Sequence, residues 1–321
     1  MARALRLARR GLYTTTPNPR VGCVLARDGK IVGEGWHRRA GEAHAEVHAI
    51  AAAGAAARGA TAYVTLEPCS HHGRTPPCAG ALIDAGVARV VAAMQDPDPR
   101  VAGGGLAALA AAGIAAQCGL LEAEAVELNA GFVSRMTRGR PWVRLKLAAS
   151  LDGKTALRNG DSQWITGAAA RRDGHRWRAR ACAILSGIGT VRDDDPRLNV
   201  RGVSTGGRQP LKVVVDSRLE LPPGARVIGD GPLLVASAIA EGERAESLRR
   251  RGVELTALPD GAGRVDLAAL MAELGRRGIN ELHVESGCRL NGALLNAGLV
   301  DEILLYLAPC LIGDAARGMF G

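Results

Sequence analysis

The chain contains 321 residues, of which 47% are hydrophobic and 23% are charged. These values are typical of a globular protein of two ordinary domains and exclude a disordered or fibrous chain. No apolar run approaches the roughly 20 residues that span a bilayer. No apolar segment follows the arginine-rich start, so we expect no signal peptide. We expect the protein in the cytoplasm.

The formal charge is +9, from 41 basic and 32 acidic residues, and most of the basic residues are arginines spread along the chain. There is no dense basic tail, and aromatic residues, which stack on bases, make up only 3% of the sequence. A nucleic-acid partner is therefore not favoured. One explanation of the positive charge is a composition that is generally rich in alanine, glycine and arginine. The other is that some arginines bind a small phosphorylated substrate, which suits the guanidinium group.

Strand-like and helical runs alternate through the first half of the chain. Two apolar runs flank Asp28-Gly29, a pair that favours a β-hairpin turn. The expected strands are residues 21–26, 31–36, 61–66, 88–94 and 114–118. The expected helices are residues 43–57, 78–85, 106–112 and 122–136. This alternation predicts an α/β domain.

Residues 137–141, Thr-Arg-Gly-Arg-Pro, interrupt the periodicity, and their charge, glycine and proline are typical of a linker. We therefore expect one domain over residues 1–139 and a second over residues 140–321. The second is again α/β, because helical stretches lie between several strands. Its expected strands are residues 142–148, 182–186, 211–215, 232–236, 253–257, 281–284 and 302–307.

Seven cysteines are scattered along the chain. An odd number at wide spacing argues against a disulfide framework. Five of them are explained as small buried hydrophobic residues: Cys23, Cys118, Cys182, Cys288 and Cys310. The other two, Cys69 and Cys78, close the two ends of a run of polar and turn-forming residues.

His44, Cys69 and Cys78 are candidate zinc ligands. An imidazole and two thiolates form a set that zinc favours, and three protein ligands leave the fourth tetrahedral position to water, as in catalytic sites. Zinc lowers the pKa of such a water toward neutrality. Glu46, two residues after His44, is the candidate catalytic residue that moves the protons. A His-x-Glu segment with a later Pro-Cys pair is the pattern of zinc nucleobase deaminases.

Other histidines offer competing metal sites. His44 and His48 are spaced i, i+4 on the expected helix, but the glutamate between them fits neither His-Glu-x-x-His nor its inverse. His48 is better explained as a helix residue without a metal. His71 and His72 are alternative ligands, although a place in the substrate pocket or in solvent explains them better. A structural zinc site in a non-enzyme is disfavoured, because structural sites have four protein ligands, whereas this set has three ligands and Glu46 beside them.

Longer segments match a known family. In the first half they are Thr16-Pro17-Asn18-Pro19-Arg20-Val21-Gly22-Cys23-Val24, His44-Ala45-Glu46 and residues 65–78. In the second half they are residues 146–154, 162–167, 189–198 and 284–287. In these segments the chain resembles the bifunctional riboflavin-biosynthesis deaminase–reductases of bacteria. Eight residues separate Cys69 from Cys78. Cytidine, deoxycytidylate and tRNA-adenosine deaminases have Pro-Cys-x-x-Cys instead.

The resemblance implies a cytidine-deaminase-like three-layer αβα domain followed by a dihydrofolate-reductase-like α/β domain. The first would use one zinc ion to deaminate 2,5-diamino-6-ribosylamino-4(3H)-pyrimidinone 5′-phosphate. The second would use NADPH to reduce the ribosyl chain to ribityl. The expected partners are this small phosphorylated pyrimidine and further copies of the chain in a homo-oligomer, with no nucleic acid and no membrane.

The resemblance also implies the residues of the reductase site. NADPH would contact Ala148, Trp164, Thr190, Asp194, Gly287, Cys288, Arg289, Leu290, Asn291, Gly292 and Ala293. The substrate would contact Ser162, Arg178, Leu198, Arg201 and Glu285.

The residues themselves support this site in part. An expected strand is followed by Gly187-Ile188-Gly189-Thr190, whose glycines would let backbone N–H groups approach a phosphate. Such a pair of glycines is also common in ordinary tight turns. It is not a Gly-x-Gly-x-x-Gly fingerprint, so a Rossmann dehydrogenase is not supported. Glu285 follows a strand, where α/β sheets bind ligands.

Two further expectations concern the end of the chain and a rival function. The family's chain continues beyond the segment that resembles residues 308–321, so we expect a reductase domain that is C-terminally incomplete. The charge of +9 suggests a nucleic-acid editor of the tRNA-deaminase type as the rival. The long loop between the cysteines, the few aromatic residues and the large second domain argue against it.

Overall fold

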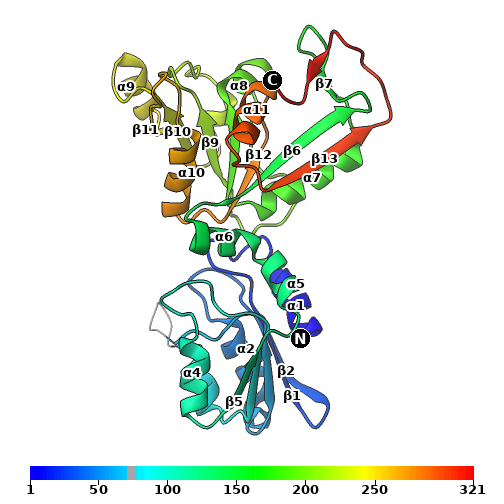
Figure 1. The fold of residues 1–321 in the computed structure, drawn as a ribbon, viewed down its shortest axis with the longest axis vertical. Coiled ribbons are helices and arrows are strands. Elements are labelled where there is room, and N and C mark those ends of the chain that lie inside the picture. The colour runs from blue at the N-terminus through cyan, green and yellow to red at the C-terminus, as the bar shows by residue number, and fades with distance from the viewer. Residues whose placement is uncertain (71–76, 163) are drawn as a thin grey trace. The chain divides into compact units, whose positions relative to one another are not determined.

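The computed structural model describes residues 1–70, 77–162 and 164–321, which form two compact units, Met1–Arg138 and Gly139–Gly321. Each unit has its own β-sheet (Figure 1). Each unit also has its own buried hydrophobic residues. No helix in the described ranges combines the length and apolarity that crossing a bilayer requires.

The first unit is built on a five-stranded sheet in the order β2-β1-β3-β4-β5. The strands are β1 (Gly22–Arg27), β2 (Lys30–Trp36), β3 (Thr61–Val64), β4 (Arg89–Ala92) and β5 (Ala115–Cys118). β1 runs antiparallel to β2 and β3, whereas β4 runs parallel to both β3 and β5. The expected hairpin is confirmed: Asp28 and Gly29 have φ of 50° and 73°, and a two-residue turn of this kind requires positive values.

Helices cover both faces of this sheet. They are α1 (Ala2–Ala8), α2 (Ala45–Ala53), α3 (Cys78–Asp84), α4 (Gly104–Ala111), α5 (Glu122–Leu128) and α6 (Ala130–Arg138). The alternation along β1 explains the layers, because successive side chains point to opposite faces. Val24 packs against α1, whereas Leu25 joins the core that holds Ala45 and Ala49 of α2. The result is the expected three-layer αβα arrangement.

Two expectations for helices in this unit are corrected, and one helix was missed. The helix expected over residues 122–136 is broken into α5 and α6 at Asn129, whose side chain accepts the Arg20 N–H at 2.8 Å and donates to the Arg20 carbonyl at 3.0 Å. The helix expected over residues 43–57 ends as α2 at Ala53 and continues as a 3₁₀ turn. Helix α1 was not expected from the sequence.

Gly35 of β2 allows α2 to approach the sheet closely. A Cβ atom at this position would lie 2.3 Å from the Ala45 carbonyl oxygen. We therefore expect Gly35→Ala to lower the free energy of unfolding of the first unit by about 1–3 kcal/mol, a typical cost of overpacking. Thermal denaturation beside Gly80→Ala, where the nearest atom to the new Cβ is 3.9 Å away, provides the comparison. Equal melting temperatures for Gly35→Ala and the wild type would contradict the expectation.

The second unit contains a seven-stranded sheet in the order β11-β10-β9-β8-β12-β6-β13, and every pairing in it is parallel. Its strands are β6 (Trp142–Ser150), β8 (Ala183–Gly187), β9 (Leu211–Val215), β10 (Leu233–Ser237), β11 (Glu254–Ala257), β12 (Glu281–Val284) and β13 (Glu302–Ala308). All seven expected strands are therefore confirmed. A small antiparallel pair consists of β7 (Lys154–Ala156) and β14 (Arg317–Gly318).

Helices again pack on the sheet of the second unit. They are α7 (Ala168–Arg180), α8 (Ile188–Asp194), α9 (Glu243–Arg249), α10 (Leu267–Arg276) and α11 (Cys288–Asn296). α8 and α9 contribute to one hydrophobic core, and α10 and α11 contribute to another. Because the strands are parallel, the loops that follow β8 and β12 meet at one edge of the sheet, where α/β proteins bind ligands.

Candidate metal centre and reductase site

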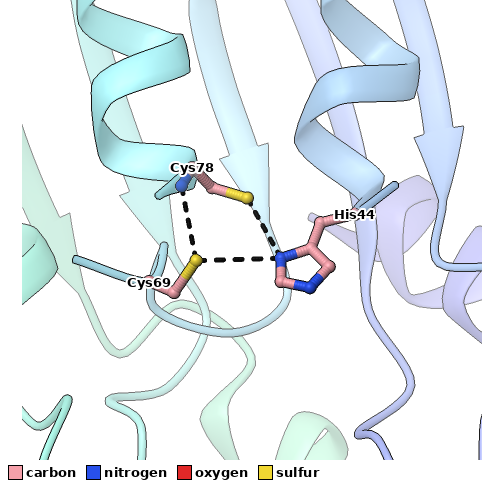
Figure 2. A group of neighbouring side chains, drawn as sticks. All are labelled: His44, Cys69 and Cys78. Atoms are coloured by element: carbon pink, nitrogen blue, oxygen red, sulfur yellow. Dashed lines mark hydrogen bonds between the residues drawn. The ribbon is translucent and has the colours of Figure 1, made fainter. Parts of the chain in front are cut away.

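Three side chains that are far apart in the sequence converge in the first unit. His44 immediately precedes α2, Cys69 lies in the loop after β3, and Cys78 is the first residue of α3 (Figure 2). The His44 Nδ1 atom lies 3.2 Å from the Cys78 Sγ and 3.7 Å from the Cys69 Sγ. All three ligand atoms lie within 4.8 Å of one another. The three residues that the sequence predicted as one site are therefore neighbours in the structure.

The chemistry of this cluster fits zinc. Ligand atoms around a tetrahedral zinc ion are separated by roughly 3.5–3.8 Å, given its usual bond lengths to nitrogen and sulfur. The observed separations of 3.2 and 3.7 Å are close to those values. The Cys69 Sγ also accepts the backbone N–H of Cys78 at 3.3 Å. Such an N–H, at the start of a helix, favours a thiolate.

The two thiols shift each other's pKa. The interaction with Cys78 lowers the pKa of the Cys69 thiol to about 4, an effect that His44 strengthens. The same interaction, together with burial, raises the pKa of Cys78. Because zinc binds cysteine as the thiolate, metal coordination favours the deprotonated form of both thiols.

Glu46 lies in the first turn of α2 and is 3% exposed. Burial raises the pKa of its carboxyl group, while the nearby His44 opposes that shift. The Glu46 Oε2 atom has no hydrogen-bond partner among the described residues. A buried carboxylate with a free oxygen beside a metal cluster is suited to accept and return a proton.

The competing histidines differ in what the structure shows of them. His48 lies one turn further along α2, and no metal group found among the described residues contains it. His71 and His72 lie outside the described residues, so their role as ligands or pocket residues stays a prediction.

A further histidine near the cluster was missed from the sequence. The rings of His37 and His44 have centroids 5.3 Å apart, and His37 is 2% exposed. The Nε2 atom of His37 lies 3.1 Å from the Nδ2 atom of Asn18. The sequence held a signal for Asn18, which stands between two prolines in one of the segments that match the family. These groups offer polar contacts beside the metal cluster.

In the second unit Glu285 is the centre of a charged group. The Arg178 guanidinium of α7 binds its carboxylate through two contacts, at 2.5 and 2.9 Å. The Lys146 Nζ lies 3.9 Å away, and the His283 Nε2 lies 3.4 Å away. Burial disfavours the charged carboxylate, but Arg178 outweighs burial and holds the pKa of Glu285 well below its usual range. Lys146 lies in a matched segment but was not expected in the site.

The other residues expected to contact substrate lie in three different surroundings. Ser162 lines a pocket of about 330 Å³ together with Asp194 and Arg317. Arg201 donates its backbone N–H to the His175 Nδ1 at 3.2 Å. Leu198 is 2% exposed and packs in a core cluster of the unit. The pocket therefore joins one residue expected for substrate, Ser162, with one expected for NADPH, Asp194.

The residues expected to contact NADPH come from several elements. Ala148 lies on β6, Thr190 lies in α8, and a Cβ atom at Gly287 would lie 3.5 Å from the Thr190 Oγ1. Trp164 is 69% exposed, and the Arg171 guanidinium lies 4.4 Å from its ring centroid.

The residues of segment 287–293 differ in how far they are buried. Gly287 immediately precedes α11, and Cys288, Arg289 and Leu290 form its first turn. Asn291 and Gly292 are buried, and Asn291 donates to the Met319 carbonyl at 3.1 Å. Ala293 is exposed. The start of α11, with its free N–H groups, is the part best suited to a phosphate.

Comparison with known proteins identifies the family of each unit. Residues 141–321 match the family described as the RibD C-terminal domain, and residues 1–94 match the cytidine and deoxycytidylate deaminase zinc-binding region. The riboflavin biosynthesis protein RibD of Escherichia coli is 52% identical over 99% of this chain and 89% of its own length. That of Haemophilus influenzae is 49% identical over 99% of this chain and 87% of its own length.

Solved structures are similar over the whole chain. The RibD structure from Acinetobacter baumannii has a TM-score of 0.92 and 45% identity, and covers 99% of this chain and 88% of its own. A deaminase/reductase from Thermotoga maritima has a TM-score of 0.88 and 36% identity over the same shares of both chains. The resemblance seen in the sequence segments is therefore confirmed, and the chain belongs to the RibD family of riboflavin-biosynthesis deaminase–reductases.

Proposed function

We propose that the first unit hydrolyses the amino group of 2,5-diamino-6-ribosylamino-4(3H)-pyrimidinone 5′-phosphate, and that the second unit reduces the ribosyl chain of the product to ribityl. The chain is a bifunctional enzyme of riboflavin biosynthesis, with a zinc-binding deaminase unit and a reductase unit. The Thermotoga maritima relative is named as the diaminohydroxyphosphoribosylaminopyrimidine deaminase and 5-amino-6-(5-phosphoribosylamino)uracil reductase, which supports these substrates.

The cluster of His44, Cys69 and Cys78 beside Glu46 is the observation that carries the deaminase assignment. These three residues would hold zinc, which, when bound, supplies a Lewis acid that makes water nucleophilic near neutral pH. Glu46 accepts the first proton of the attacking water at Oε2 and passes it to a ring nitrogen of the substrate while the C–O bond forms. It then carries the second proton from the new hydroxyl group to the amino group, which departs as ammonia when the C–N bond breaks and the C=O bond forms.

Glu285 and its cationic partners support the reductase assignment. NADPH, when bound, supplies a hydride. Arg178 and Lys146 fix the Glu285 carboxylate at the edge of the sheet, so that it can accept hydrogen bonds from the sugar hydroxyl groups. The pocket of about 330 Å³ lined by Ser162 and Asp194 brings together one residue expected to contact substrate and one expected to contact NADPH, which supports a ligand site there.

We also propose that the enzyme works in the cytoplasm as a homo-oligomer. NADPH and phosphorylated pyrimidines are intracellular metabolites, which supports the compartment. Sedimentation of the purified chain over a range of concentrations tests the oligomer.

The test of the function is an assay of products. The chain is incubated with the diaminopyrimidine phosphate, with and without NADPH, and the products are identified by mass spectrometry. We expect ammonia and the aminouracil without NADPH, and 5-amino-6-(5-phosphoribitylamino)uracil with it. Unchanged substrate in a zinc-loaded sample would refute the deaminase assignment, and NADPH-independent formation of the ribityl product would refute the reductase assignment.

A further inference from the structure

Glu67 is a buried carboxylate that the mechanism does not use. It lies between β3 and Cys69, and it is 3% exposed. Its two oxygens accept four backbone N–H groups, all from one segment of chain after β4. The donors are Asp96 at 3.1 Å and Gly103 at 2.9 Å to Oε2, and Gly105 at 2.9 Å and Leu106 at 3.1 Å to Oε1.

A carboxylate is the side chain that suits this position. It has about four lone-pair sites and no donor, so four N–H groups fill its capacity. Gly105 and Leu106 lie in the first turn of α4, where backbone N–H groups have no partner within the helix and the helix dipole favours a negative charge. An amide of the same shape would offer one acceptor oxygen and would direct its NH₂ group at two of the donors.

The backbone around Cys69 also lies against this segment. A Cβ atom at Gly105 would be 1.8 Å from the Pro68 carbonyl oxygen, and a Cβ atom at Gly104 would be 2.7 Å from the Ser70 Oγ. The residues on both sides of Cys69 therefore contact the start of α4.

We propose that Glu67 is a positioning residue for the metal centre: its carboxylate fastens the loop that carries Cys69 to the start of α4 and so sets the Cys69 thiolate at its distance from His44 and Cys78. The proposal rests on the zinc site proposed above. If Glu67 served only the general stability of the fold, its loss would lower the melting temperature without changing how fast the folded protein gives up its metal.

The experiment measures zinc release from the purified, zinc-loaded full chain to a chromogenic chelator, well below the melting temperature. Glu67→Gln is expected to release zinc 10- to 100-fold faster than the wild type, the usual effect of removing a group that supports a metal ligand. Excess zinc is expected to restore part of kcat with little change in KM. The reductase activity of the same chain should stay unchanged, because the second unit has its own core.

Glu124→Gln is the matched control, since Glu124 is an exposed carboxylate of the same unit, and it should release zinc at the wild-type rate. Release from a folded Glu67→Gln chain at that same rate would overturn the proposal. A wild-type chain that binds no zinc tightly would instead refute the metal centre, and with it any role for Glu67 in holding the ligands.

A second pair of variants decides the matter if Glu67→Gln prevents folding of the first unit. Leu106→Pro deletes one of the four donors and leaves the carboxylate, and proline is tolerated in the first turn of a helix. Leu106→Ala shortens the same side chain and keeps the N–H. We expect the proline variant to release zinc roughly fivefold faster than the alanine variant, the equivalent of one hydrogen bond. Equal rates would overturn the proposal.

Discussion

Ammonia release should fall by roughly 10²–10⁴-fold in Glu46→Gln, the range that positioned acid–base groups contribute. The amide has nearly the same shape as the carboxylate but cannot take the proton from water. Glu46 is 3% exposed, and its Oε2 has no hydrogen-bond partner among the described residues, so the substitution removes an oxygen that is available to take the proton. Ammonia is measured in a coupled assay, and zinc by elemental analysis.

Zinc content should remain normal in this variant, because Glu46 is not one of the three clustered ligand residues. NADPH oxidation should also remain normal when the deaminated intermediate is supplied, because the second unit has its own hydrophobic cores. Glu124→Gln again serves as the control for loss of one negative charge from the first unit. A fully active Glu46→Gln enzyme would remove Glu46 from the mechanism. Loss of zinc together with activity would show that Glu46 supports the metal instead of moving protons.

NADPH oxidation should fall by roughly 100-fold or more in Glu285→Gln. A hydrogen bond from a substrate hydroxyl group to a charged carboxylate contributes roughly 1.5–3 kcal/mol, which the neutral amide largely loses. The substitution also leaves two cations without their anionic partner, since Arg178 lies 2.5 Å and Lys146 lies 3.9 Å from the Glu285 carboxylate. The absorbance of NADPH, followed with the deaminated intermediate as substrate, reports the effect.

Ammonia release by Glu285→Gln should match that of the wild type, which separates a local effect from general unfolding. Glu243→Gln, at an exposed carboxylate in α9 of the same unit, is the matched control and should reduce its substrate normally. Wild-type reduction by Glu285→Gln would contradict the place of this carboxylate in the reductase site.

Local patterns predicted most of the secondary structure. The Asp28-Gly29 pair predicted the hairpin because its residues tolerate positive φ, and they adopt it. The break at Asn129 was not predictable from its own neighbourhood. Its side chain binds the backbone of Arg20, which lies 109 positions earlier in the chain, and such a contact leaves no trace in helical periodicity.

The candidate site shows the same division. The residue types and spacing of His44, Cys69 and Cys78 indicated one metal site, because few functions other than zinc binding require that set. The surroundings depend on tertiary contacts. Glu67 is saturated by N–H groups from residues 96–106, and Lys146 reaches Glu285 only because β6 and β12 are neighbours in the sheet. A single sequence contains no local signal for either contact.

The separate hydrophobic cores of the two units have a consequence for genetics. A lesion that inactivates one active site should leave the other folded and working, since each unit has a hydrophobic core of its own. Two defective alleles, one altered at Glu46 and the other at Glu285, should therefore complement each other when they are expressed in the same riboflavin-requiring cell. Each polypeptide would then supply the step that its counterpart lacks.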